Sequence, residues 1–513
     1  MENRILLSGN EAVAYAALHA GLTLGTGYPG TPSSEILECL SAIGGKAQWA
    51  PNEKVALEVG IGVAFAQGRA LVTMKHVGLN VAADPFFSVA FTGVDGALVI
   101  ISADDPGMSS SQNEQDNRRY AAAAGVPMLE PSDAQEAYDF TWEALRLSAQ
   151  SQLPVLLRVT TRICHSKSLV RFRAERFPGP DTDFRRDIRR RVMIPAHARP
   201  AHKRLRQRLR DIQELNESSP LNRVIDGDSA LGVITSGIAF MHVREAIPTT
   251  KVLKLGTTYP LPLNTIRAFV ESVERCVVVE EGDPYLVENL RTAGITVEDK
   301  PEQYRFGELT VERVRRIIRA DDGPEPVHAG GKPPELCAGC PHRMSFNVLD
   351  RLNCIVSGDI GCYTLGALSP YEAMDTQLCM GASIGIGLGL RHALRDEEAR
   401  RVVSVIGDST FFHSGLTGIA EMVYNPPRTG HVVLILDNGT TAMTGLQEHP
   451  GTGHALNHGS AKQILPEDVV RAMGVDHVEV VEYGRALEQA LAAAMAKDEL
   501  SVIVMRQPCR LMK

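Results

Sequence analysis

The chain has 513 residues, 44% hydrophobic and 22% charged, and this composition excludes collagen-like, mucin-like and disordered proteins. At roughly 150 residues per domain, the length suggests about three domains. The net charge of −8 gives no overall electrostatic reason to bind nucleic acid. The sequence contains no run of about 18 apolar residues, so we expect no membrane span.

The first 170 residues alternate short β-branched runs with longer stretches of helical spacing. Asn10 is expected to cap a helix that continues through Ala20. Strands that alternate with helical crossovers predict a parallel, doubly wound α/β module over residues 1–170. The other elements expected there are a strand over 22–26, helices over 33–43 and 53–67, and strands over 70–74, 97–102 and 154–160.

Residues 171–228 differ in charge from the rest of the chain, because 171–223 contain 15 Arg and Lys against 7 Asp and Glu. One interpretation is a solvated helix between domains. Another is a basic docking surface for an acidic redox partner, since opposite charge speeds encounter. Nucleic acid is the weakest alternative, because the only interleaved aromatics are Phe172, Phe177 and Phe184.

The rest of the chain returns to the α/β pattern. Residues 229–320 predict a smaller α/β domain, and the Pro/Gly-rich stretch after it, through Pro334, predicts a linker. Residues 335–513 predict a second large module, so the expected fold is α/β, with two doubly wound modules flanking a smaller domain. The strands expected in these regions cover 230–235, 251–255, 275–280, 354–357, 401–406, 431–436 and 501–505.

The nine cysteines are an odd number, thinly spread, which does not suggest a disulfide framework. The N-terminus has no long apolar core, so we expect no signal peptide. A protein with this cysteine usage is expected to work in the reducing cytoplasm.

Two polar motifs follow predicted buried strands in the last module. Gly407-Asp408-Ser409 ends one strand, and Asp437-Asn438-Gly439 ends another after 27 intervening residues. A carboxylate and an amide oxygen delivered from neighbouring strand ends can bind Mg²⁺; the alternative is a pair of ordinary strand-end turns. The arrangement resembles the diphosphate and Mg²⁺ motif of thiamine diphosphate enzymes. That resemblance implies side-chain ligation by Asp408 and Asn438, with a backbone carbonyl from Thr440.

Thiamine diphosphate enzymes also use a carboxylate that hydrogen-bonds N1′ of the aminopyrimidine. In the family this Glu begins a helix in the other α/β module, and Glu53 fits that position. Glu58 is the competing candidate. A third interpretation makes Glu53 a helix N-terminal charge favoured by the helix dipole.

Longer motifs indicate a particular branch of these enzymes. Together they resemble the large subunit of indolepyruvate:ferredoxin oxidoreductases, in the 2-oxoacid:ferredoxin oxidoreductase superfamily, over essentially all 513 residues. The resemblance implies that Gly358, Asp359, Gly381, Gly407 and Ser409 contribute to cofactor binding. The motifs are LSGNEAVA (7–14), GYPGTPSSE (27–35), MKHVGLN (74–80), ADDPGM (103–108), CAGCPH (337–342), GDIGCY (358–363) and LDNGTTAMTG (436–445).

The resemblance implies oxidative decarboxylation of an arylpyruvate, with coenzyme A taking the acyl group and ferredoxin or another iron-sulfur acceptor taking the electrons. It also implies a smaller β subunit and a hetero-oligomer built on a dimer of such pairs. Residues 1–170 then bind the pyrimidine end, 335–513 bind the diphosphate and Mg²⁺, and 229–320 are a transketolase C-terminal-like domain. No binding to nucleic acid or membrane is expected.

One departure from the family concerns electron transfer. The large subunit usually ends in a ferredoxin domain with two C-x2-C-x2-C-x3-C runs, whereas this sequence stops four residues after Cys509. Either a separate iron-sulfur subunit replaces that domain, or the oxidative half-reaction is not performed. A non-oxidative thiamine decarboxylase and a non-catalytic assembly subunit therefore remain as alternatives.

The order of four cysteines favours the oxidative interpretation. Cys337 and Cys340 form a C-x2-C pair, Cys362 follows after 21 intervening residues, and Cys509 lies just past the last strand. This order is similar to the ligands of the cluster nearest thiamine in pyruvate:ferredoxin oxidoreductases, which implies a [4Fe-4S] cluster. Zinc is the main metal alternative, and a purely structural role stays open.

The loop that contains Thr31 follows a strand and precedes a helix, so its hydroxyls and amides can converge on an anion. In the superfamily the matching Thr contacts the 2-oxoacid carboxylate, a role that Thr31 inherits by resemblance; its alternative is a turn with an N-cap. His76 and His413 are candidate proton donors near the cofactor.

Overall fold

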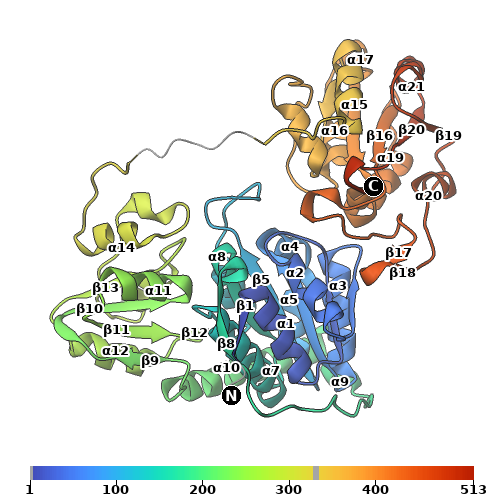
Figure 1. Ribbon diagram of the computed structural model, residues 1–513. Coiled ribbons are helices and arrows are strands. Elements are labelled where there is room, and N and C mark those ends of the chain that lie inside the picture. The colour runs from blue at the N-terminus through green and yellow to red at the C-terminus, as the bar shows by residue number, and fades with distance from the viewer. Residues whose placement is uncertain (1–3, 327–333, 513) are drawn as a thin grey trace. The chain divides into compact units, whose positions relative to one another are not determined.

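The computed structural model describes residues 4–326 and 334–512 (Figure 1). The chain divides into two compact units, Met1–Pro326 and Val327–Lys513, and each unit is described by itself. Residues 327–333, which belong to the linker expected from the sequence, lie outside the described residues.

The first unit is built on a mainly parallel sheet. Among its described residues, seven strands run in the order β12-β6-β7-β5-β4-β2-β3. The strands from β2 to β7 pair in parallel, whereas β12 pairs antiparallel with β6. This confirms the doubly wound sheet predicted from the alternation of strands and helices. The strands are β2 (Leu24–Gly27), β3 (Ala47–Trp49), β4 (Arg69–Lys75), β5 (Ala97–Asp104), β6 (Met128–Leu129), β7 (Val155–Thr160) and β12 (Thr257–Tyr259).

The first helix begins differently from the expectation. Ser8, not Asn10, is the N-cap of α1, because its hydroxyl accepts from the Glu11 N–H at 3.2 Å and the Glu11 carboxylate accepts from the Ser8 N–H at 2.7 Å. Asn10 instead donates to the Pro32 carbonyl at 2.7 Å. The expected cap was therefore wrong. The helices around this sheet are α1 (Gly9–His19), α2 (Ser34–Ala42), α3 (Glu53–Phe65), α4 (His76–Val81), α5 (Ala83–Thr92), α6 (Arg118–Ala124), α7 (Ala134–Ser151), α8 (Thr161–His165) and α9 (Ile188–Arg191).

The basic segment contributes a long helix to the same unit. In α10 (Pro195–Glu217) the side chains of Leu205, Leu209 and Ile212 are buried in the main hydrophobic core. They recur at helical spacing, so one face of α10 packs inward while arginines and Lys203 lie exposed on the others.

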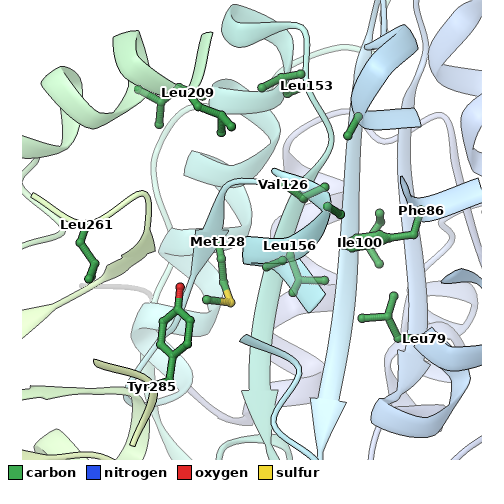
Figure 2. Close-up of a cluster of buried hydrophobic side chains, with 14 of the residues drawn as sticks. Leu79, Phe86, Ile100, Val126, Met128, Leu153, Leu156, Leu209, Leu261 and Tyr285 are labelled. Atoms are coloured by element: carbon green, nitrogen blue, oxygen red, sulfur yellow. The ribbon is translucent and has the colours of Figure 1, made fainter. Parts of the chain in front are cut away.

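A smaller sheet belongs to the first unit as well. Its strands within the described residues run in the order β13-β10-β11-β9, and the short β12 from this part of the chain joins the edge of the large sheet. Figure 2 shows Tyr285 beside Met128 of β6, and Leu261 belongs to the same hydrophobic core. The remaining elements are β1 (Arg4–Ser8), β8 (Lys167–Arg171), β9 (Arg223–Ile225), β10 (Asp228–Ser236), α11 (Gly237–Ala246), β11 (Thr250–Leu255), α12 (Leu263–Glu271), β13 (Cys276–Val279), α13 (Tyr285–Thr292), η1 (Glu302–Arg305) and α14 (Val311–Ile318).

The second unit has its own parallel sheet, with the order β14-β15-β16-β20-β19 among the described residues. This agrees with the predicted second doubly wound module. Its strands are β14 (Ile355–Ser357), β15 (Val402–Gly407), β16 (His431–Asp437), β17 (His454–Ala455), β18 (Gly459–Ser460), β19 (His477–Val481) and β20 (Leu500–Arg506). Its helices are α15 (Pro341–Arg351), η2 (Cys362–Ala367), α16 (Ala382–Ala393), α17 (Asp396–Ala399), α18 (Asp408–Thr410), the π-helix η3 (Phe411–Gly415), α19 (Leu416–Tyr424), η4 (Ala442–Thr444), η5 (Leu456–His458), α20 (Pro466–Ala472), α21 (Arg485–Met495) and η6 (Arg510–Met512).

Over residues 4–326 and 334–512, none of the helices combines the length and the apolar character that crossing a lipid bilayer requires.

Candidate functional site

In the second unit the two predicted strand-end motifs meet. The neighbouring strands β15 and β16 pair in register up to Gly407 and Leu436, so their carboxyl ends lie side by side. The Asp408 carboxylate accepts from the Ser409 N–H at 2.9 Å and from the Gly439 N–H at 2.8 Å. These contacts join the second motif to the first at a buried carboxylate.

Asn438 and Thr440 complete this group of oxygen donors. The Asn438 amide oxygen accepts from the Thr440 N–H at 3.1 Å, and both residues are buried. The Thr440 carbonyl accepts from the Ala442 N–H at 3.0 Å and keeps a second lone pair. A carboxylate, an amide oxygen and a backbone carbonyl therefore lie on one short stretch of the sheet edge.

His449 is a neighbour of Asp408 that the sequence did not single out. Its Nε2 lies 3.2 Å from Asp408 Oδ2, and its Nδ1 accepts from the Gly451 N–H at 3.1 Å. Because Nδ1 accepts a hydrogen bond, the ring proton belongs on Nε2, facing the carboxylate. Burial acts to raise the pKa of Asp408, but the neighbouring His449 and the Ser409 N–H act against it and hold the pKa below its usual value.

Asp359 organises a second group of predicted cofactor residues at the start of α16. Its carboxylate accepts from the Gly381 N–H at 2.9 Å and from the Ser383 N–H at 3.0 Å, while burial raises its pKa. Gly381 has a φ of +86°, and a Cβ there would lie 2.5 Å from the Ser414 Cβ, so a side chain is excluded. A Cβ on Gly358 would lie 2.4 Å from the Met374 sulfur.

The four cysteines of the predicted cluster are neighbours in the same unit. Cys340 N–H donates to the Cys337 carbonyl at 3.0 Å, which closes the C-x2-C turn. Burial raises the pKa of Cys362 to about 11, and the thiols of Cys340, Cys509 and Cys337 act in the same direction. Each of these thiols is therefore close enough to affect the ionisation of Cys362.

Among the described residues, no group of three or more Cys, His, Asp or Glu side chains is arranged to hold one metal ion. Cys354, left outside the predicted set, packs its sulfur 3.7 Å from that of Met495.

Asn438 forms one hydrogen bond with Cys509 and lies close to His342, which follows Cys340. Cys509 N–H donates to the Asn438 carbonyl at 2.9 Å. His342, two residues after Cys340, places its Nε2 3.4 Å from the Asn438 amide nitrogen, and burial lowers the pKa of His342 to about 4. A neutral His342 can accept from that amide, which leaves the Asn438 oxygen for other partners.

His413 is buried on η3, with its Nδ1 2.7 Å from the Ser414 hydroxyl.

In the first unit Glu53 and Glu58 have different environments. Glu53 is buried at the start of α3, next to Gly78, where an added Cβ would lie 2.6 Å from Glu53 Oε1. Glu58 is exposed one turn later and forms an ion pair with Lys54. Glu53 is therefore shielded from solvent, whereas Glu58 faces it.

Thr31 and His76 lie beyond the carboxyl ends of β2 and β4. The Thr31 carbonyl accepts from the Ser110 hydroxyl at 3.3 Å. His76 is fully buried, with Nε2 3.0 Å from the Asn113 side-chain oxygen, and its Nδ1 has no hydrogen-bond partner among the described residues. The ring proton is therefore expected on Nε2.

Comparisons with known proteins place this chain in a family. Residues 15–179 match the family model described as "Pyruvate flavodoxin/ferredoxin oxidoreductase, thiamine diP-bdg", and residues 359–505 match "Thiamine pyrophosphate enzyme, C-terminal TPP binding domain". The indolepyruvate oxidoreductase subunit IorA of Archaeoglobus fulgidus is 40% identical over 99% of this chain and 87% of its own length. The chain belongs to the IorA family. IorA of Methanothermobacter thermautotrophicus is 41% identical over the same shares.

Membership of the IorA family confirms the resemblance seen in the motifs, and the chain is part of a thiamine diphosphate-dependent 2-oxoacid oxidoreductase. A solved structure of the 2-oxoglutarate:ferredoxin oxidoreductase from Magnetococcus marinus, with 2-oxoglutarate, coenzyme A and succinyl-CoA bound, matches with a TM-score of 0.54 and 17% identity. The match covers 62% of this chain and 65% of that one. It supports the α/β fold.

Proposed function

We propose that this IorA-family chain is the thiamine diphosphate subunit of an enzyme that oxidatively decarboxylates an arylpyruvate, with indolepyruvate as the type substrate. The observation that carries the proposal is the direct contact between two donor sets in one unit. The Cys509 N–H on the Asn438 carbonyl, at 2.9 Å, joins a predicted cluster ligand to a predicted Mg²⁺ ligand.

The oxygen donors fit Mg²⁺ and the diphosphate of the cofactor. Mg²⁺ prefers oxygen ligands and keeps positions open for phosphate oxygens. Asp408 stays ionised because its pKa is held low, so it supplies the charge, while Asn438 and Thr440 supply neutral oxygens. Gly407, Ser409 and the Asp359 loop with Gly358 and Gly381 would form the rest of this cofactor site.

The cysteines fit a [4Fe-4S] cluster better than one zinc ion. A single ion needs its ligands around one point, and the described residues contain no such group. The ligands of a cubane surround a larger object. Burial is the main cause of the raised pKa of Cys362, and the thiols of Cys340, Cys509 and Cys337 add to it; bound iron cations would favour the thiolate forms. Cys337, Cys340, Cys362 and Cys509 are therefore the proposed ligands.

When bound, thiamine diphosphate supplies a nucleophilic carbon and an electron sink, and an iron-sulfur cluster supplies a one-electron acceptor. Glu53 would hold a proton at the aminopyrimidine N1′. Thr31 would orient the substrate carboxylate, and His76 and His413 are the candidate proton donors.

Further partners complete the reaction. A smaller β subunit is expected as in the family, in a hetero-oligomer built on a dimer. Ferredoxin or a separate iron-sulfur subunit would take the electrons, and coenzyme A the acyl group. We assign residues 1–170 to the pyrimidine end of the cofactor, 335–513 to the diphosphate end and 229–320 to a smaller domain, and the site of action to the cytoplasm.

The test is anaerobic purification followed by iron, sulfide and thiamine analysis, with turnover of indolepyruvate measured with and without coenzyme A. About four irons per chain and a reduced-state EPR signal are expected from one cubane. Cys340→Ala should lose both, whereas Cys354→Ala, a matched cysteine outside the set, should keep them. Zinc in place of iron, or a colourless protein that releases aldehyde, would refute the oxidative assignment.

A further inference from the structure

Lys75 lies beside the loop that the proposed function assigns to the substrate carboxylate. It is the last residue of β4, and the loop with Thr31 follows the adjacent parallel strand β2. A Cβ built on Gly30 would lie 3.4 Å from both Cγ and Cδ of Lys75, so the stem of this side chain runs along the loop backbone. Its ammonium therefore belongs to the same strand-end edge as Thr31.

The ammonium is anchored but not neutralised. Nζ donates to the Ser110 carbonyl at 2.9 Å, and Ser110 in turn donates its hydroxyl to the Thr31 carbonyl. An ammonium has three donor positions. Among the described residues, Lys75 forms no ion pair with a carboxylate. Two donors are thus left for a ligand.

Asp105, the acidic group whose charge acts most on Lys75, accepts its hydrogen bonds from other donors. Asp105 Oδ2 accepts from the Ser110 N–H at 2.8 Å and from the Ser111 hydroxyl at 2.6 Å, and Oδ1 accepts from the Thr161 hydroxyl at 2.9 Å. Asp105 and Glu53 act on Lys75 only through their charge, raising its pKa, while burial lowers it by a larger amount. A partly buried cation of this kind gains stability from an anion that touches it.

The buried arginines of this part of the sheet are already paired. Arg158 contacts Asp104 at 2.7 Å and Glu130 at 2.9 Å. Arg118 contacts Asp116 at 2.5 Å and Glu280 at 2.7 Å. Carboxylates within hydrogen-bond distance neutralise the charges of these two arginines. Lys75 differs from them because it has no such carboxylate partner among the described residues.

We propose that Lys75 binds the carboxylate of the 2-oxoacid substrate next to Thr31. The inference rests on the proposed function and adds the cationic group that the carboxylate site needs. An acid enters an edge that already carries Asp105 and Glu53, so without Lys75 the charge there would repel the substrate. The 2-oxo acid would receive charge-assisted hydrogen bonds from Nζ, with the Thr31 loop fixing its orientation.

The test compares the holoenzyme carrying Lys75→Gln, Lys75→Arg or Lys54→Gln with the wild type. Lys54 is an exposed lysine that pairs with Glu58 and serves as the matched control. Two competitive inhibitors are used, 3-(indol-3-yl)propionate and its amide, which differ only in the carboxylate charge. Thiamine diphosphate affinity is measured in each variant, together with kcat and KM for indolepyruvate.

Lys75→Gln should raise KM and the Ki of the carboxylate inhibitor about 10- to 100-fold, with kcat and the Ki of the amide changed less than about threefold. Lys75→Arg should recover most of the affinity for the carboxylate, and Lys54→Gln should change nothing. An equal loss for acid and amide, or a loss of thiamine diphosphate binding, would show a structural role and overturn the inference. No effect of Lys75→Gln in an active enzyme would also overturn it but leave the proposed function standing, whereas a wild type without 2-oxoacid turnover would overturn the function itself.

Discussion

His449→Ala should weaken Mg²⁺ binding without unfolding the second unit. Two backbone N–H groups donate to the Asp408 carboxylate, and His449 Nε2 lies 3.2 Å from its Oδ2 as an ion-pair contact. Removing an outer partner of a metal ligand lowers metal affinity by about 10- to 100-fold, and each tenfold change corresponds to about 1.4 kcal/mol. Since two donors remain in the variant, the expected loss is at the lower end of the range for outer partners of metal ligands, about tenfold.

The assay is a Mg²⁺ titration of thiamine diphosphate binding, followed by calorimetry or by quenching of intrinsic fluorescence. His449→Gln should retain most of the affinity, because its amide N–H can replace Nε2. His458→Ala is the matched control, since His458 is exposed and pairs with Glu448 rather than with Asp408. The reasoning fails if His449→Ala binds Mg²⁺ like the wild type, or if the His458 variant loses as much affinity.

Three further predictions concern both units. Asp408→Ala should abolish Mg²⁺-dependent binding of thiamine diphosphate while thermal unfolding stays cooperative; normal cofactor affinity would refute the ligand assignment. Glu53→Gln should slow exchange of the thiazolium carbon proton, measured by NMR, whereas Glu58→Gln should not; the reverse result would transfer the role to Glu58. Burial raises the pKa of Glu281 from 4.5 to about 7, and its Oε2 has no hydrogen-bond partner among the described residues. The protonated carboxyl therefore contributes stability that is fully present below pH 4.5 and is lost as the pH rises through 7. Glu281→Gln should therefore stabilise the protein by about 3 kcal/mol at pH 8 and little at pH 4.5 in denaturant titrations, and equal effects at both pH values would contradict this.

The parallel sheets could be predicted from the sequence because strands that are buried on both faces consist of short runs rich in β-branched residues. Every residue of β5, for example, is buried. The cap of α1 could not be assigned in the same way, since Ser8 and Asn10 are both good N-caps. The contacts of Asn10 with Pro32 and Glu35, 22 and 25 residues away, show that Asn10 is used elsewhere.

At the candidate site, the spacing of Gly407 and Asn438 predicted that their strands end together, because parallel neighbours share one edge. His449 could not be found in this way. It reaches Asp408 from a loop whose path depends on tertiary contacts such as the Thr441 N–H on the Gln447 carbonyl at 2.9 Å. The available signal was a histidine following shortly after the Asn438 motif, which is too common to be specific.

The hydrogen bond from Cys509 to Asn438 has a thermodynamic consequence. Under the proposed ligand assignments, a rearrangement of the backbone at Cys509 would shift Asn438, so the occupancies of the proposed cluster site and the proposed Mg²⁺ site would be coupled equilibria. Coupling free energy is reciprocal, and whatever factor iron loading adds to Mg²⁺ affinity, Mg²⁺ must add to the affinity for iron. With positive coupling between the two proposed sites, loss of the proposed cluster would lower the affinity for Mg²⁺ and hence for thiamine diphosphate.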